Sequence, residues 1–338
     1  MVRRLAGKIS EMKLLVIGCG SIGGRHALNA QKFAETAVVD INADYASERA
    51  RQLGASYFGS LGEALEWKPD GAVIATPTCS HADIAKQCIQ AGIPVLIEKP
   101  LADTPEKAEE LLCLVKETNI KSYVVCNMRF HPAVKALRDN LKHIGRPYYA
   151  RAHFGNYLPN MRPAADYSKL YCASRKMGGG LILDCIHEID YLMHFFGPVT
   201  SVKSACARLS DLKIDVEDYA NLTLMHKRGV ISEIHFDYLR PFKRRGCEIT
   251  GEAGMLLWQS EGKAPESCRV QMFLKETEKW RTLFESDKMD HNKPLYELMQ
   301  GFVSAVNNGA ASDMLDVFSA YDELKIAYKA TEEGLMDE

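Results

Sequence analysis

Short apolar runs alternate with amphipathic stretches over about the first 125 residues of the chain. The apolar runs predict strands at 13–17, 37–39, 56–58, 71–75, 94–97 and 122–125. The stretches between them repeat apolar positions at helical spacing and predict helices at 21–32, 43–53, 79–91 and 104–118. Short apolar strands separated by helices favour parallel pairing with helices on both faces. The pattern therefore predicts a doubly wound α/β sheet.

The pattern changes after residue 126. A helix at 132–142 is followed by longer alternating strands at 148–154, 199–207, 219–225, 230–238, 245–250, 254–259 and 270–273. A glycine-rich helix at 178–196 and two helices at 295–307 and 313–331 complete the elements. The strand spacing and the Lys227-Arg228-Gly229 turn favour a mostly antiparallel sheet. We therefore expect two domains, 1–126 and 127–338, the second of the α+β class.

Composition and charge exclude several classes of protein. The 338 residues are 46% hydrophobic and 25% charged with a formal net charge of −2, which lacks the basic excess of a nucleic-acid surface. Lys243-Arg244-Arg245 is short and is interpreted as solvated surface. The ten cysteines form no Cys-x-x-Cys pair, and residues such as Cys113 and Cys126 are expected in the core of a cytoplasmic protein. The apolar run at 14–17 is too short for a membrane span.

A Gly-x-Gly-x-x-Gly turn at 18–23 follows the first strand and opens the first helix. Gly18 allows a tight turn, Gly20 lets the backbone approach a pyrophosphate, and Gly23 lets helix and strand pack closely. The helix begins with Ser21 and Ile22, and its free N–H groups and positive dipole end suit phosphates. The turn in this context predicts a dinucleotide site.

Asp40 ends the second strand, 22 residues after Gly18, where an acidic side chain meets the ribose hydroxyls of NAD. A 2′-phosphate would face a like charge there, and we expect no adjacent arginine to offset it. NAD is therefore predicted over NADP, although Asp40 could instead be a helix N-cap. The loop after the fourth strand is also expected to line the cofactor, with residues Ala75, Thr76, Pro77 and His81. His81 could equally cap a helix or lie on the surface, and it receives no catalytic role.

Glu98-Lys99-Pro100 directly follows the fifth strand, and both charged residues are expected at the cofactor crevice. The Lys99 ammonium at this strand end could polarise a substrate oxygen or hold the alkoxide formed during oxidation. The proline ring could support a cis peptide. Without a partner site, Lys99 would be an ordinary solvated lysine.

Three motifs in this order resemble the glucose–fructose oxidoreductase/inositol dehydrogenase/MocA family: the glycine turn, the Glu-Lys-Pro and a later Gly-Gly-Gly-x-x-x-Asp…His-x-x-Asp helix. The resemblance covers nearly the whole chain. It implies a Rossmann domain, a second domain with an open sheet, and oxidation or reduction of a sugar-like hydroxyl or ketone by a pyridine nucleotide. It also implies a homodimer or homotetramer that pairs through the open sheet.

The resemblance assigns roles to Lys99 as a substrate and cofactor contact and to His187 as acid/base, three residues before Asp190. The family aspartate commonly lies four residues before the histidine, whereas Asp184 lies three before His187. Both spacings put the two side chains on one helix face, so we expect the pair to survive. Histidine is poised near neutral pH, and a carboxylate can orient it. The alternative is that His187 is a core histidine on an apolar helix.

Substrate contacts are expected at the start of the second domain and in the loop 156–176. By resemblance the stretch with Asn127 and Arg129 lines the pocket, although Arg129 could form a domain-interface salt bridge. Tyrosines stack on sugar rings and arginines pair with carboxylate or phosphate. The full candidate set is Asn127, Arg129, Tyr157, Arg162, Tyr167, Tyr171, Arg175, Asp184 and His187, and the alternative for the loop is a stiff surface segment.

The helix form also resembles a branch associated with surface-polysaccharide and nucleotide-sugar pathways. We therefore predict a dehydrogenase for a sugar, sugar acid or nucleotide sugar, with no metal and with no nucleic-acid or membrane partner. Three other functions stay open: an NAD-retaining glycosidase of the same fold, a non-catalytic NAD-binding regulator, and reduction of a non-sugar carbonyl or imine. The presence of both Lys99 and His187 argues against the regulator.

Overall fold

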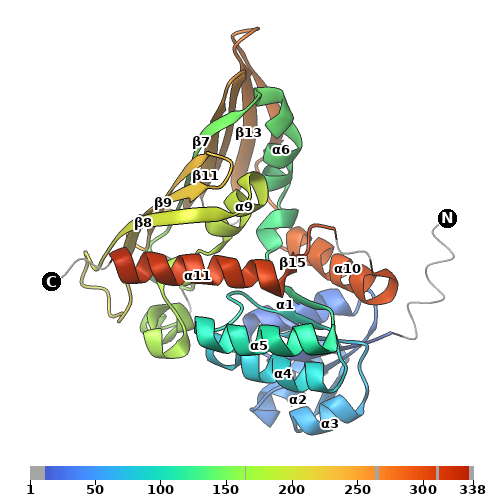
Figure 1. Cartoon of the computed structure of the whole chain (residues 1–338). Helices are drawn as coiled ribbons and strands as arrows, with labels where there is room; N and C mark the ends of the chain where they lie inside the picture. The colour runs from blue at the N-terminus through green and yellow to red at the C-terminus, as the bar shows by residue number, and fades with distance from the viewer. Residues whose placement is uncertain (1–11, 164, 263–265, 310–311, 335–338) are drawn as a thin grey trace. The chain divides into compact units, whose positions relative to one another are not determined.

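The computed structural model describes residues 12–163, 165–262, 266–309 and 312–334, which form two compact units. Unit 1 combines the described residues up to Asn127 with Asn292–Tyr321, and unit 2 combines Met128–His291 with the described residues from Asp322 (Figure 1). The division is therefore not a single cut after residue 126, because the chain returns to unit 1 near its end.

Unit 1 is a seven-stranded sheet in the order β15-β6-β5-β4-β1-β2-β3. All neighbours pair in parallel except β15 and β6, which confirms the predicted doubly wound sheet. The strands are β1 Lys13–Ile17, β2 Glu35–Val39, β3 Ser56–Phe58, β4 Gly71–Ile74, β5 Val95–Ile97, β6 Ser122–Val124 and β15 Leu315–Asp316. The helices are α1 Ser21–Ala30, α2 Ala43–Leu53, α3 Leu61–Glu66, α4 His81–Gln90, α5 Pro105–Thr118 and α10 Lys293–Asn308, with a 3-10 turn η3 at Thr78–Ser80.

Helix α10 belongs to the core of unit 1, although the sequence pattern assigns its residues to the second domain. Figure 1 shows α10 beside α1, and the Phe33 and Tyr296 rings lie 5.1 Å apart. Phe302 is fully buried, and a Cβ at Gly71 would lie 3.1 Å from its ring. Close packing of this kind needs residues far apart in sequence, so local periodicity alone cannot assign α10 to a unit.

Unit 2 contains an eight-stranded sheet in the order β14-β13-β12-β11-β7-β10-β9-β8. Only β7 and β10 pair in parallel, so the predicted, mostly antiparallel sheet is confirmed. The strands are β7 Pro147–Gly155, β8 Val199–Ala207, β9 Tyr219–His226, β10 Ile231–Asp237, β11 Arg244–Gly251, β12 Gly254–Glu261, β13 Ser267–Leu274 and β14 Lys279–Ser286. The sequence analysis predicted no strand for the edge strand β14. The first four residues of β14 are all exposed, so apolar and polar positions do not alternate there.

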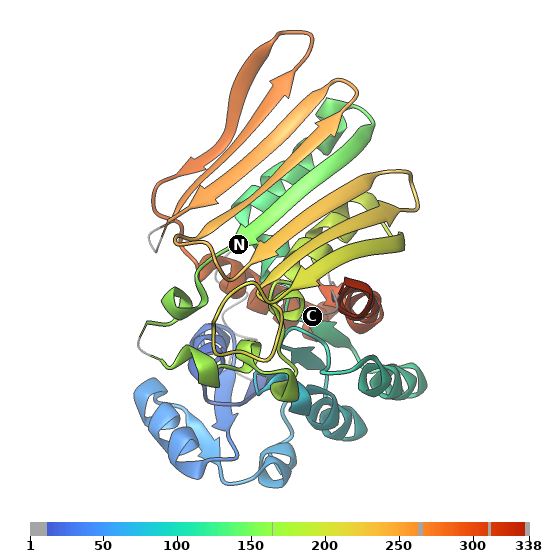
Figure 2. The same ribbon diagram turned by 90° about the vertical axis from the view of Figure 1, so that its left-hand side faces the viewer.

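Helices cover one face of this sheet, and Figure 2 shows the other face with no helix of the described residues across it. Helix α6 packs on β12, β13 and β14, and α9 on β7 and β10. The helices are α6 Pro132–Asn140, α7 Leu158–Met161, α8 Leu181–Asp184, α9 His187–Phe196 and α11 Val317–Gly334. The 3-10 turns are η4 Asn127–Phe130, η5 Leu141–Ile144, η6 Tyr167–Lys169, η7 Tyr171–Ala173 and η8 Arg175–Met177.

Two surface and core assignments differ from the sequence interpretation. Lys243 and Arg245 are not free solvated charges: Lys243 pairs with Glu266, and the Arg245 Nε lies 2.8 Å from a Glu188 oxygen. Cys113 is exposed on α5, whereas Cys126 is buried, and all ten cysteines are free thiols. Among the residues that the structure describes, no helix has the length and apolar character needed to cross a membrane.

Candidate functional site

The glycine turn has the geometry that a dinucleotide requires. Gly18 has φ of +100°, and a Cβ there would lie 2.5 Å from the Ala75 carbonyl oxygen. A Cβ at Gly23 would lie 1.9 Å from the Gly18 carbonyl oxygen, so both glycines are sterically required. A Cβ at Gly20 would meet no described atom within 4 Å, which leaves the backbone open to a ligand.

The N-terminus of α1 is suited to an anion. Gly20 is the N-cap and provides no side-chain hydrogen bond, and the first turn contains no acidic residue. Ser21 is exposed and Ile22 is half-buried at this helix start. Free N–H groups and the positive dipole end therefore face the open backbone of the turn, and these residues fit a pyrophosphate.

Asp40 lies at the end of β2 and is anchored to the glycine turn. Its Oδ2 accepts a hydrogen bond of 2.7 Å from the Cys19 N–H, and its Oδ1 accepts one of 2.9 Å from the Asn42 N–H. The N-cap of α2 is Asn42, whose side chain accepts from two backbone N–H groups of the first turn. The alternative reading of Asp40 as that helix's N-cap is therefore wrong.

An arginine that the sequence analysis did not expect contacts the same residue as this carboxylate. The Arg49 Nε and Nη2 donate to the Cys19 carbonyl oxygen at 3.3 and 3.2 Å. Asp40 and Arg49 thus contact the two ends of one residue's backbone. The sequence separates them by nine positions, and only the turn of the chain into α2 brings them together.

The loop after β4 is tied to the loop after β5 by His81. The ring nitrogens of this fully buried histidine lie 2.9 Å from the carbonyl oxygens of Thr76 and Pro100. Burial lowers the pKa of His81, with the two carbonyl contacts opposing that shift. Ala75 is buried and Pro77 is exposed in the same loop. His81 therefore holds two backbone segments together and does not lie on the surface, and its place among the cofactor-lining residues stays a prediction.

Glu98 is a buried anchor under Lys99. Its Oε1 lies 2.7 Å from the His26 Nε2, and its Oε2 accepts a 3.2 Å hydrogen bond from the Lys99 N–H. Burial raises the pKa of Glu98, but the His26 hydrogen bond and nearby positive charges outweigh it and lower the pKa. Lys99 is half-buried, and the Lys99–Pro100 peptide is cis, as the sequence suggested. Sequence patterns gave no signal for His26.

The predicted helix 178–196 is broken between its two candidate catalytic residues. Asp184 is the last residue of α8 and His187 the first of α9, with Cys185 at φ −98° and ψ 21° between them. The two residues therefore do not lie on one continuous helix, and the pairing of their side chains stays a prediction. His187 is half-buried at the start of α9.

Asp184 is held by two phenols. Tyr171 donates to its Oδ1 at 2.5 Å, and Tyr238 donates to its Oδ2 at 3.1 Å. Burial, followed by the Asp184 charge, raises the pKa of Tyr238 well above its usual range, so this hydroxyl stays protonated. Tyr171 was a substrate candidate, whereas Tyr238 lies just beyond β10 and was missed, because a tyrosine ending a strand has no distinctive pattern.

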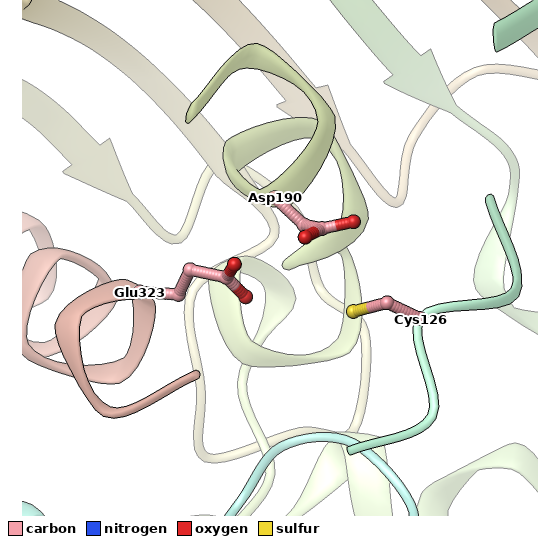
Figure 3. A group of neighbouring side chains, drawn as sticks. All are labelled: Cys126, Asp190 and Glu323. Atoms are coloured by element: carbon pink, nitrogen blue, oxygen red, sulfur yellow. The ribbon is translucent and has the colours of Figure 1, made fainter. Parts of the chain in front are cut away.

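Arg129 belongs to a buried ion-pair cluster in unit 2. Its Nη2 lies 2.6 Å from Asp190 Oδ1 and 3.6 Å from Glu323 Oε1. Figure 3 shows the carboxylates of Asp190 on α9 and Glu323 on α11 as close neighbours. The guanidinium is the cation between two buried acids, so its observed contacts favour a structural role inside unit 2 over substrate binding.

The remaining candidates divide into exposed and packed residues. Tyr157, Arg162 and Arg175 are exposed, and Asn127 is half-buried at the start of η4. The Tyr167 hydroxyl accepts a 3.3 Å hydrogen bond from the Lys213 N–H, and the Arg175 N–H donates to Asp215 at 2.7 Å. Their roles toward a substrate stay predictions.

Comparison with known proteins gives two family matches along the chain. Residues 12–125 match the model described as "Oxidoreductase family, NAD-binding Rossmann fold", and residues 133–257 match the model of the GFO/IDH/MocA C-terminal domain. The two matches lie in the order that the motifs predict. The first match spans the parallel strands of unit 1, and the second spans most of the strands of the sheet in unit 2.

Two curated relatives and one solved structure illustrate the likeness. D-apiose dehydrogenase of Paraburkholderia graminis is 28% identical over 73% of this chain and 68% of its own length. UDP-N-acetylglucosamine 3-dehydrogenase of Acidithiobacillus ferrooxidans is 35% identical over 42% of this chain and 45% of its own length. The structure of an oxidoreductase from Agrobacterium radiobacter in complex with NAD+, L-tartaric acid and magnesium has a TM-score of 0.81, with 20% identity and 96% of both chains covered. At 20% identity, the likeness to this solved structure supports the fold alone.

Proposed function

The chain belongs to the GFO/IDH/MocA oxidoreductase family with an NAD-binding Rossmann fold, and from that premise we propose that it interconverts a secondary hydroxyl and a ketone on a sugar, sugar acid or nucleotide sugar. The names of the relatives support this substrate class, because both curated relatives are dehydrogenases of sugars or nucleotide sugars. The observation that carries the proposal is the Glu98-anchored Lys99 at the carboxyl end of β5, on the same edge of the parallel sheet as the dinucleotide turn after β1.

Lys99 is proposed to bind the oxygen of the reacting carbon. Glu98 fixes the backbone of Lys99 through the N–H, and His81 fixes the Pro100 carbonyl, so the segment that bears the ammonium is held on both sides. A positive charge placed on that oxygen stabilises the negative charge that develops when the hydroxyl is oxidised. NAD supplies the hydride acceptor, and its reduced form the donor.

His187 is proposed to take the hydroxyl proton during oxidation and to return it during reduction. Its position as the first residue of α9 places the ring at a helix end and not within a continuous apolar helix. A histidine in this role exchanges a proton near neutral pH. Asp184 accepts hydrogen bonds from Tyr171 in the loop and from Tyr238 beyond β10. We propose that Asp184 thereby fixes the position of the loop residues that contact the substrate.

The test measures NADH formation at 340 nm (the absorbance of the reduced cofactor) with a panel of sugars, sugar acids and nucleotide sugars. Stoichiometric NADH accumulation with at least one member is expected. Transient NADH with glycosidic cleavage would instead indicate the NAD-retaining glycosidase. No change in NADH absorbance with any compound, in either the oxidation or the reduction direction, would contradict the sugar assignment.

His187→Ala is expected to lower kcat at least about 100-fold, because general acid–base catalysis contributes about 10²- to 10⁴-fold. NADH affinity, measured by fluorescence titration, should stay within about twofold, since the cofactor residues lie in unit 1. The exposed His143 serves as the matched control, and His143→Ala should leave both quantities unchanged. Near-normal turnover of His187→Ala would remove the acid/base role.

A further inference from the structure

Asp40 and Arg49 place opposite charges on the backbone of one residue in the dinucleotide turn. The Asp40 Oδ2 accepts from the Cys19 N–H at 2.7 Å, and the Arg49 guanidinium donates to the Cys19 carbonyl at 3.2 and 3.3 Å. An acidic residue here binds the 2′-hydroxyl of NAD, whereas an arginine nearby accommodates the 2′-phosphate of NADP. This chain therefore carries both determinants at once.

The guanidinium of Arg49 is held in place by three contacts. Besides the Cys19 carbonyl, its Nη1 donates to Gln52 Oε1 at 3.0 Å. A Cβ at Gly24 would lie 2.7 Å from the guanidinium carbon, so the missing side chain of Gly24 provides the space that this group occupies. Three of the five guanidinium N–H groups make these bonds, which leaves two for an anion.

We propose that Arg49 is a second determinant of cofactor choice, preplaced to bind a 2′-phosphate and countered by the Asp40 carboxylate. The NAD preference of the chain then rests on one carboxylate acting against an arginine, and not on the absence of a cation. Removing the Asp40 charge exposes Arg49 to the phosphate, which is a partner that planar guanidinium groups bind in a forked geometry. The inference rests on the dinucleotide site alone and does not depend on the sugar assignment.

A purely structural brace would act differently. If Arg49 only stabilises the turn, its loss should weaken the binding of NADH and NADPH to the same extent, because both share the pyrophosphate and nicotinamide. A determinant of cofactor choice changes the ratio of the two dissociation constants. The ratio is therefore the quantity to measure.

The experiment titrates NADH and NADPH into the full-length protein and follows cofactor fluorescence, which needs no substrate. Asp40→Asn keeps an oxygen for the Cys19 N–H but removes the charge, and it should tighten NADPH binding about 10- to 100-fold, the range of one or two charge-assisted hydrogen bonds. Asp40→Asn/Arg49→Gln should lose that gain, while its NADH binding stays within about threefold of that of Asp40→Asn. Arg49→Gln alone should weaken NADPH binding further and spare NADH.

Arg51 provides the matched control, since it lies on the same helix, is exposed and pairs with Glu48. Asp40→Asn/Arg51→Gln should bind NADPH as tightly as Asp40→Asn. Asp40→Ser is the second variant if the asparagine perturbs folding. The proposal fails if the Asp40→Asn gain survives the loss of Arg49, if no gain appears in either Asp40 variant, or if Arg49→Gln weakens both cofactors equally.

Discussion

At the scale of single residues, the molecule uses buried polar groups to fix the segments that carry its candidate site. Glu98 with His26 anchors the Lys99 backbone, His81 bridges two loop carbonyls, and two phenols hold the carboxylate of Asp184. Buried groups of this kind cost free energy when a partner is removed, so each one fixes a local geometry. The residues that touch a ligand are thus only part of what the site requires.

Tyr238→Phe tests the Asp184 contact. The change removes one donor from the carboxylate and should lower the free energy of unfolding by about 1–3 kcal/mol, since one hydrogen bond to a charged group is lost in a buried setting. Urea denaturation measures this loss. Because Tyr171 shares the carboxylate, KM for the best substrate should rise more than kcat falls.

The exposed Tyr148 is the control, and Tyr148→Phe should leave stability and KM unchanged. An unaltered KM in Tyr238→Phe, together with the expected loss of stability, would show that Asp184 is structural only.

At the scale of elements, helix ends and breaks decide where the site residues stand. The break between α8 and α9 puts Asp184 at the end of one helix and His187 at the start of the next, and α6 begins at a histidine cap. His131 Nδ1 accepts the Ala133 N–H at 3.2 Å, so its ring must be neutral at this nitrogen. Burial, followed by the charge of Arg245, lowers the pKa of His131 from 6.5 to about 3.

The lowered pKa predicts a pH dependence of stability. The unfolded chain binds a proton near pH 6.5 but the folded ring does not until about pH 3, so the contribution of His131 is complete above pH 6.5 and is lost as the pH falls. The contribution lost on this descent is on the order of 5 kcal/mol. His131→Asn keeps a capping oxygen and does not titrate, so its free energy of unfolding should fall less steeply between pH 6.5 and 4.

Urea denaturation at several pH values gives the two slopes. Loss of the ring contact with Trp258 lowers the stability of the variant by a pH-independent amount and leaves the comparison of slopes intact. His143→Asn, at an exposed site, should follow the wild-type slope. Parallel curves for wild type and His131→Asn would contradict the assignment of this pKa shift.

At the scale of the whole molecule, the first unit is completed by a segment near the end of the chain. Helix α10 supplies Phe302 to the core against Gly71 and Tyr123, and β15 pairs with β6, the last parallel strand, and forms the edge of the sheet. The dinucleotide fold thus depends on residues more than 160 positions beyond its last parallel strand. Substitutions in α10 should therefore weaken cofactor binding by lowering the stability of unit 1.

Phe302→Ala should lower the free energy of unfolding by about 3–5 kcal/mol, the usual effect of removing a buried phenyl ring. Thermal melts without NADH measure the loss of stability in the variant, and melts with NADH measure how much of that stability cofactor binding restores. Phe318→Ala removes a ring that is 38% exposed and should have a much smaller effect. Equal melting temperatures for Phe302→Ala and wild type would contradict the placement of α10 in this core.

Local sequence determined the elements and the motifs of this protein. The parallel strands of unit 1, the glycine turn and the Glu-Lys-Pro segment follow from periodicity and from residue types that only one backbone conformation suits, such as Gly18 at φ +100°. The antiparallel β15 does not, because the pattern predicted a helix at 313–331, whereas Leu315–Asp316 form a strand and the helix begins at Val317. The order of these motifs also predicted the family, which the comparisons confirm. Such features depend on neighbours within a few positions along the chain.

Only the tertiary structure decided which distant residues meet. It placed Arg49 against Cys19, Tyr238 on Asp184, Arg129 between two buried acids and α10 in the first unit. Each of these contacts joins segments whose separate patterns look ordinary, because a surface arginine and a buried one have the same local sequence signal. Long-range packing and charge pairing fix them, and these forces act between residues that are close in space but far apart in the chain.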